Sequence, residues 1–156
     1  MKGAIADEGA VAASAPPNRM GIAIASLAGL LISIYLLLYK LGVIRTLVCG
    51  TGNCEVVQSS KWSDFLGLPV PLWGVIGYGV VLATALRGVQ PGRAGDRRIA
   101  LLLAGSSTLA FLFSIYLSAI EEFVIGAWCR WCISSAVVAT ALFLLSLPEF
   151  RRLRAR

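Results

Sequence analysis

The sequence predicts an all-α integral membrane protein: a bundle of four transmembrane helices, with a short amphipathic helix in the first extracytoplasmic loop. Hydrophobic residues make up 58% of the 156 positions, and the mean hydropathy is +0.81. Charged residues make up only 14%, against roughly 25% in soluble proteins. Four long uncharged runs divide the chain, and we expect each of them to cross the bilayer once.

The predicted spans, in chain order, cover residues 20–39, 71–86, 99–120 and 129–147. The first run has twenty uncharged residues, more than the apolar core of a secretory signal, so we expect a retained helix rather than a cleaved signal peptide. Residues 1–19 are rich in Ala, Gly, Ser and Pro and predict a disordered cytoplasmic tail. Residues 149–156 predict a basic cytoplasmic tail, so the membrane domain covers residues 20–148.

The basic residues predict the orientation of the bundle. Four spans put both termini on one side, and ten Lys and Arg residues lie in the termini and in the loop between the second and third spans. The other side carries only Lys40, Arg45, Lys61 and Arg130. Because Lys and Arg are enriched in cytoplasmic loops, we expect both termini in the cytoplasm. All four cysteines then lie on the extracytoplasmic face, where disulfides persist.

A Cys-x-x-Cys motif, Cys129 and Cys132, opens the fourth predicted span. In a first helical turn, residues three apart share a face, so the two sulfurs are neighbours and can open and close a disulfide with little backbone movement. The helix N-terminus and the cation of Arg130 both favour the reactive thiolate. A buried structural pair or half of a zinc site is the alternative interpretation.

The second pair, Cys49 and Cys54, lies in the loop after the first span, with Gly-Thr-Gly-Asn between the cysteines. A turn this tight can close a disulfide. Asn53 can cap a short helix over about residues 54–65, which mixes apolar and polar residues and predicts an amphipathic helix at the bilayer surface.

Two pairs on one face, one mobile and one fixed, can act as a relay. Thiol–disulfide exchange passes through a mixed disulfide, so we expect the loop pair to meet an outside protein and then pass electrons to the helix pair. Cys129 is expected to be the more exposed of the helix pair, and Cys132 to lie one turn deeper, where a membrane quinone could accept electrons.

Aromatic and hydroxyl side chains near the cysteines are candidate quinone contacts. We expect the flat ring to be walled by Trp62, Phe65, Trp128 and Trp131. Ser60 can donate a hydrogen bond to a quinone oxygen. Trp is also common at membrane interfaces without a catalytic role. Glu121 and Glu122 mark the interface, with proton relay as the minor alternative.

The combination of motifs resembles one known family, over roughly residues 22–147. The motifs are Cys49 and Cys54, Ser59-Ser60-Lys61-Trp62, Gly67-Leu68-Pro69-Val70, Gly74, Tyr78, and Trp128-Cys129-x-x-Cys132. On these residues the chain resembles bacterial members of the vitamin K epoxide reductase family.

The resemblance implies a four-helix bundle around a quinone, in a bacterial cytoplasmic membrane. It implies that Cys132 faces the quinone, Cys129 exchanges with Cys54, and Cys49 contacts a thioredoxin-like partner. It also implies that Ser60 lies near the quinone. Vertebrate members carry a Tyr where this chain has Ala136, and an Asn where it reads Val70-Pro71-Leu72-Trp73, so epoxide reduction is not expected.

We therefore expect a membrane thiol:quinone oxidoreductase that reoxidises a thioredoxin-fold, DsbA-like protein and drives disulfide formation. The quinone is ubiquinone or menaquinone, and the partner is expected to be a separate outer protein. DsbB-type oxidases carry their Cys-x-x-Cys in the first outer loop, the reverse of the order here. A thiol-based metal-ion carrier and a non-catalytic subunit with structural disulfides are the other hypotheses. The chain has no His, which excludes Ser-His and Cys-His catalytic pairs.

Overall fold

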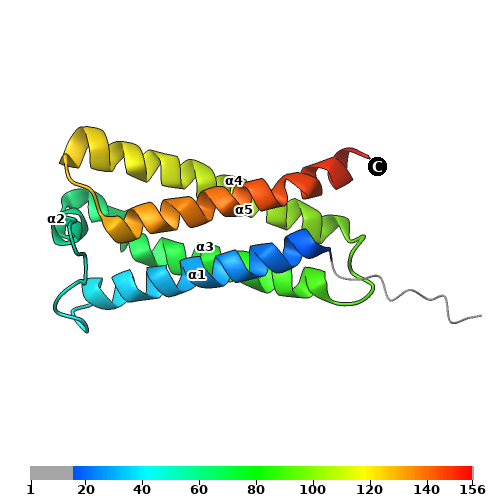
Figure 1. Cartoon of the computed structure of the whole chain (residues 1–156), viewed down its shortest axis with the longest axis horizontal. Coiled ribbons are helices and arrows are strands. Elements are labelled where there is room, and N and C mark those ends of the chain that lie inside the picture. The colour runs from blue at the N-terminus through cyan, green and yellow to red at the C-terminus, as the bar shows by residue number, and fades with distance from the viewer. Residues whose placement is uncertain (1–15, 156) are drawn as a thin grey trace, which may run out of the picture.

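Four long helices packed lengthwise form the protein in the computed structural model, which describes residues 16–155 (Figure 1). They are α1 (Pro17–Lys40), α3 (Val70–Val89), α4 (Arg97–Ile120) and α5 (Arg130–Arg154). All four are long and apolar enough to cross a membrane, the third of them with the π-helical turn η2 (Glu121–Ile125) that continues α4. The predicted helical fold with four spans is thus confirmed, and the chain is a multi-pass membrane protein.

The helix of the first span begins before residue 20, the predicted start of that span. Pro17 fits the first turn of α1, where a missing backbone N–H costs nothing, and places Asn18 and Arg19 inside the helix. Residues 1–15 of the predicted tail lie outside the described residues. At the same end of the bundle, the Asp96 side chain caps α4 by accepting a hydrogen bond from the Arg98 N–H at 2.9 Å.

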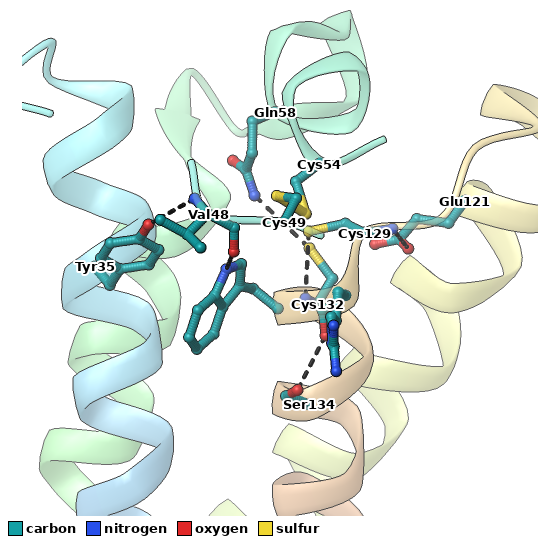
Figure 2. The surroundings of a disulfide bond; sticks show 11 residues. Tyr35, Val48, Cys49, Cys54, Gln58, Glu121, Cys129, Cys132 and Ser134 are labelled. Carbon is teal, nitrogen blue, oxygen red and sulfur yellow. Dashed lines mark hydrogen bonds between the residues drawn. A yellow bond between two sulfur atoms is a disulfide. The ribbon is translucent and has the colours of Figure 1, made fainter. Parts of the chain in front are cut away.

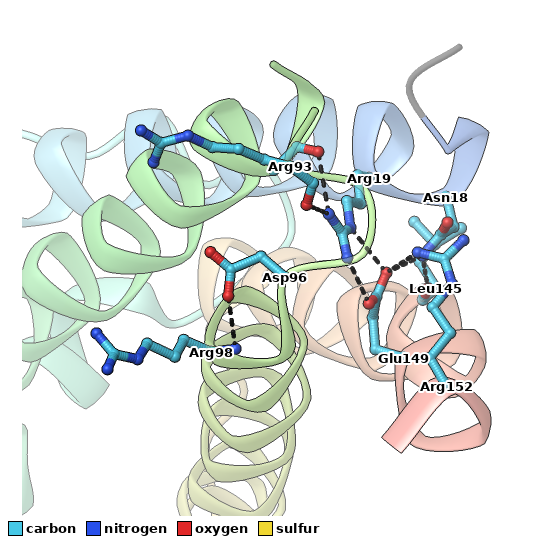
Figure 3. A network of polar contacts seen from close by, with 9 residues as sticks. Asn18, Arg19, Arg93, Asp96, Arg98, Leu145, Glu149 and Arg152 are labelled. Carbon is cyan, nitrogen blue, oxygen red and sulfur yellow. Dashed lines mark hydrogen bonds and ion pairs between the residues drawn. The ribbon is translucent and has the colours of Figure 1, made fainter. Parts of the chain in front are cut away.

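The helix of the fourth span runs past residue 147, the predicted end of that span: α5 continues through Pro148 to Arg154. Proline removes one helical hydrogen bond, so a continuing helix needs other support. Glu149 supplies it: its carboxylate pairs with Arg19 of α1 and with Arg152 on the next turn. The buried pair holds the last turns of α5 against α1 (Figure 3).

The helices pack so that α1 lies between α3 and α5, and α4 contacts the same two helices. The centre of the bundle is apolar, with fully buried residues on all four helices: Ile22, Val81, Ala85, Leu103 and Leu142. Gly29 of α1 lies against the ring of Tyr78, so α1 and α3 approach closely there.

A short lid covers one end of the bundle, between α1 and α3. It consists of α2 (Cys54–Ser59), a 3₁₀ turn, η1 (Lys61–Ser63), and a small antiparallel hairpin, β1 (Asp64–Phe65) and β2 (Leu68–Pro69). The predicted helix over 54–65 is therefore shorter than expected, and the Asn53 side chain makes no capping hydrogen bond. At the hairpin turn, Leu66 and Gly67 both have positive φ, 55° and 78°, as a two-residue hairpin turn requires.

Lys40, at the end of α1, holds the lid in place. Its ammonium donates to the Gln58 carbonyl at 3.1 Å and to the Ser63 hydroxyl, and pairs with the Asp64 carboxylate at 3.2 Å. One side chain thereby fixes α2, η1 and β1 to the bundle. The lid and the first turn of α5 lie at one end, while Pro17 and the end of α5 lie at the other (Figure 1).

Candidate dithiol site

The two cysteine pairs meet under the lid. Cys49 and Cys54 form a disulfide with their Cα atoms 6.1 Å apart, and Cys129 and Cys132 are free thiols (Figure 2). Cys49, Cys54 and Cys129 are buried in one hydrophobic cluster, and Cys132 packs against it. The fold therefore joins a loop pair and a helix pair that are far apart in the sequence.

The loop that carries the disulfide is fixed on both sides. The Val48 N–H donates to the Tyr35 hydroxyl at 3.0 Å, and the Val48 carbonyl accepts from the Trp131 indole N–H at 3.1 Å. The rings of Tyr35 and Trp131 pack with centroids 5.0 Å apart. Beyond the disulfide turn, the Asn53 N–H donates to the Trp128 carbonyl at 3.1 Å. Both tryptophans beside the Cys-x-x-Cys motif thus hold the disulfide loop.

Cys129 is the N-cap residue of α5. Its sulfur accepts a hydrogen bond from the backbone N–H of Cys132 at 3.3 Å. The Cys132 thiol also hydrogen-bonds this sulfur, which lowers the pKa of the Cys129 thiol below its usual value, although burial opposes the shift. Cys129 is therefore poised to form the thiolate that attacks disulfides.

The prediction that Cys129 is the more exposed member of the helix pair was wrong. Cys129 is 0% exposed, and Cys132 is partly exposed. The reason is that the disulfide loop and the residues before α5 cover Cys129 from outside. Cys132 instead opens onto a cavity inside the bundle.

This cavity has a volume of about 580 Å³ and mostly apolar walls. It lies between α3 and α4, and it reaches the lid at one end and the first turn of α5 at Cys132. Aromatic rings form part of its wall: Phe65 packs edge-on against Phe113 and Trp73, with centroids 5.3 Å and 6.3 Å apart. Cavities of this size and character hold small organic molecules in other proteins.

Of the five residues predicted as quinone contacts, Phe65 lines this cavity. Ser60, Trp62, Trp128 and Trp131 do not line it, and their contact with a quinone stays a prediction that the cavity does not support. The Ser60 hydroxyl donates to the Val57 carbonyl at 2.7 Å. Trp62 lies at the surface under the Lys61 ammonium, and Trp128 is likewise exposed.

Sequence reasoning missed Gln58, a polar residue that contacts the Cys132 sulfur. Its amide N–H donates to the Cys132 sulfur at 3.7 Å, and its amide oxygen, although buried, has no hydrogen-bond partner among residues 16–155. Gln58 follows Cys54 by four residues, so the two side chains share one face of α2. This spacing could have placed Gln58 near the cysteines, but several other polar residues in the same segment made it hard to single out.

The described residues assemble no group of three or more Cys, Asp, Glu or His side chains that could hold a metal ion. The cysteines instead form one closed disulfide and one open dithiol beside an apolar cavity. This arrangement defines a class: a four-helix membrane protein in which a disulfide and a dithiol lie together beside an apolar cavity.

The comparisons with known proteins identify the family. The model of the vitamin K epoxide reductase family matches residues 20–147, so the chain belongs to that family. The resemblance inferred from the motifs is confirmed. The chain is also similar to the thiol-disulfide oxidoreductase LTO1 of Arabidopsis thaliana, at 28% identity over 106 residues. The match covers 65% of this chain and 28% of LTO1, so the chain spans little more than a quarter of that relative.

Proposed function

We propose that the protein is a membrane thiol:quinone oxidoreductase that reoxidises a thioredoxin-fold protein on the extracytoplasmic side and so drives disulfide formation. One observation carries the proposal: a closed disulfide and a free dithiol lie in contact under the lid, and Cys132 opens onto an apolar cavity in the membrane part. The disulfide that can meet an outside protein and the cysteine that can meet a membrane molecule thus belong to one cluster.

The loop pair receives electrons first. A partner dithiol attacks the Cys49–Cys54 disulfide through a mixed disulfide with Cys49, and leaves as a disulfide while both loop cysteines become thiols. Cys54 then attacks an oxidised Cys129–Cys132 pair at Cys129, which closes the loop disulfide again and leaves the helix pair as thiols. The structure has this last arrangement, with the loop pair closed and the helix pair open.

The residues around the cavity fit a quinone head group. Phe65, Trp73 and Phe113 offer flat apolar faces. The Gln58 amide NH2, which donates one N–H to Cys132, has a second N–H that can donate to a quinone oxygen. The quinone supplies an acceptor for two electrons and two protons. Cys132 is the sulfur that faces it, because Cys132 lines the cavity and Cys129 does not.

The orientation follows from charge. The end of the bundle with the α3–α4 loop and the end of α5 carries most of the Arg residues, so we place it in the cytoplasm and the lid outside. A thioredoxin-fold partner then reaches Cys49, whose loop is exposed around the buried disulfide.

The test is quinone reduction by purified protein supplied with a reduced thioredoxin-fold protein and followed by quinone absorbance. We expect turnover in the parent protein and in Ser134→Ala, which changes an exposed hydroxyl one turn from Arg130 on α5. We expect none in Cys132→Ala or Cys49→Ala. Absence of turnover in the folded parent with ubiquinone and menaquinone analogues would overturn the proposal, and metal titration of the thiols would then test the carrier alternative.

A further inference from the structure

Glu121 is a buried carboxylate beside the dithiol. It begins the π-helical turn that follows α4, and it is 5% exposed. Its Oε2 accepts a hydrogen bond from the backbone N–H of Cys129 at 3.2 Å, and Figure 2 shows the carboxylate turned toward Cys129. Within residues 16–155, no Lys or Arg side chain forms an ion pair with Glu121. Burial of a carboxylate without a cation is costly, so a fold without a use for it would place an apolar residue here.

The carboxylate also lies beside the second cysteine. Glu121 and Cys132 line the same cavity, and the Glu121 carboxylate and the Cys132 thiol interact there. The groups facing Glu121 are therefore the two cysteines of the helix pair, and the neutral Gln58 amide reaches Cys132 from the lid. The turn that places Glu121 here ends at Gly126, in the left-handed conformation with φ 66°, and this redirects the chain toward Cys129.

We infer that Glu121 is the catalytic group that takes the Cys132 proton during oxidation of the dithiol and delivers it to the quinone. The inference rests on the proposed function. The Cys132 S–H bond breaks, its proton moves to the Glu121 carboxylate, and an S–S bond forms to Cys129 as two electrons leave for the quinone. Glu121 then releases the proton to a quinone oxygen. Cys129 loses its own proton to the outside water, and a second proton from that water completes the quinol.

The first experiment compares Glu121→Gln with Glu122→Gln. The Gln side chain keeps an oxygen that accepts the Cys129 N–H but cannot carry a proton, so the loop geometry is retained. Glu122 is the matched control, because it is the same residue type one position along and is exposed. We expect Glu121→Gln to slow quinone reduction about 100-fold, the lower end of general acid–base effects. Glu122→Gln should match the parent. The loss should appear in kcat rather than in KM for the quinone, since Glu121 acts in the proton transfer.

The second experiment needs no quinone. Alkylation of the reduced protein by N-ethylmaleimide, read at Cys132 by mass spectrometry, measures how readily this thiol loses its proton. If Glu121 acted only as a nearby negative charge, its removal would ease thiolate formation and speed the reaction. If Glu121 accepts the proton, Glu121→Gln slows alkylation near neutral pH, and the rate then rises more steeply with pH than in the parent.

The two experiments separate the two proposals. A parent protein that reduces quinone, with Glu121→Gln unchanged in turnover and equal or faster in alkylation, would overturn the role of Glu121 and leave the proposed function intact. A parent that reduces no quinone would overturn the proposed function, and the alkylation rates would still decide whether Glu121 accepts the Cys132 proton. Thermal unfolding of both variants checks that each is folded, and Glu121→Asp should regain part of the rate.

Discussion

The buried ion pair between Arg19 and Glu149 gives the strongest prediction about stability. The guanidinium donates to both carboxylate oxygens, at 3.0 Å and 2.9 Å, and both side chains are fully buried. It also donates to the Gly88 and Arg93 carbonyls, at 3.0 Å and 3.1 Å, so one side chain joins α1, α3, α5 and the α3–α4 loop. Arg19→Met removes all four hydrogen bonds and leaves the buried Glu149 carboxylate without its main cationic partner.

The expected magnitude follows from what Arg19→Met leaves behind. Removal of one partner of a buried ion pair costs about 3–5 kcal/mol. Glu149 keeps hydrogen bonds from Asn18 at 2.8 Å and from Arg152 at 3.0 Å, so we expect the lower end of that range, about 3 kcal/mol. For a chain of this size, 3 kcal/mol corresponds to a fall in Tm of about 6–12 °C.

The assay is thermal unfolding of the purified protein in one detergent, with Arg87→Met as control because Arg87 is an exposed Arg on α3. We expect Arg87→Met to leave Tm nearly unchanged. The double variant Arg19→Met/Glu149→Leu removes the orphaned carboxylate as well, so it should regain at least half of the lost stability. Equal Tm values for Arg19→Met and the Arg87→Met control would refute the reasoning, because the ion pair would then add nothing to the stability of the fold.

Three further predictions concern the site and its packing. Trp131→Phe keeps the ring against Tyr35 but loses the hydrogen bond to the Val48 carbonyl, worth about 0.5–1.5 kcal/mol. Hydrogen exchange of the loop amides should therefore rise roughly two- to thirteen-fold, and unchanged exchange would contradict the role of this contact. Cys132→Ala removes the hydrogen bond that lowers the pKa of Cys129, so thiolate absorbance of Cys129 should appear at higher pH than in the parent, whereas an unchanged or lower midpoint would disprove this cause. Gly29→Ala places a Cβ against the Tyr78 ring and should destabilise the fold by about 1–3 kcal/mol in detergent melts. Gly79→Ala, where a Cβ meets nothing within 4 Å, should leave the stability unchanged. Equal melting temperatures of the two variants would argue against the close contact of α1 and α3.

The spans were predictable because charge and hydropathy act over whole segments. Each predicted span overlaps its helix, and the largest difference from the helix bounds, at the end of α5, arose from a local rule about proline. The contact that supports the helix beyond Pro148 is the ion pair of Glu149 with Arg19, 130 positions away in the sequence. No local pattern near Pro148 predicts it. Arg19 itself was assigned to a tail, since an Arg before an apolar run usually lies in water.

The site was predictable in its sulfur atoms and much less so in its surroundings. Cysteine spacing identified both pairs, and the short turn between Cys49 and Cys54 indicated their disulfide. The burial of Cys129 could not be predicted, because it depends on where the disulfide loop folds back. Trp131 was predicted to contact the quinone ring, and its hydrogen bond to the Val48 carbonyl was not predicted, because the sequence does not show which way an indole points.

The central claim is that electrons pass from the helix dithiol at Cys132 to a quinone, and a single-turnover measurement tests it most directly. Fully reduced protein, freed of reductant and mixed with excess ubiquinone or menaquinone analogue under anaerobic conditions, should reduce quinone and lose two thiols for each quinol formed. Cys132→Ala should reduce none in the same time, while Ser134→Ala should match the parent. Quinol formation in Cys132→Ala at the parent rate, or thiols that persist in the parent beside the quinone, would contradict the account.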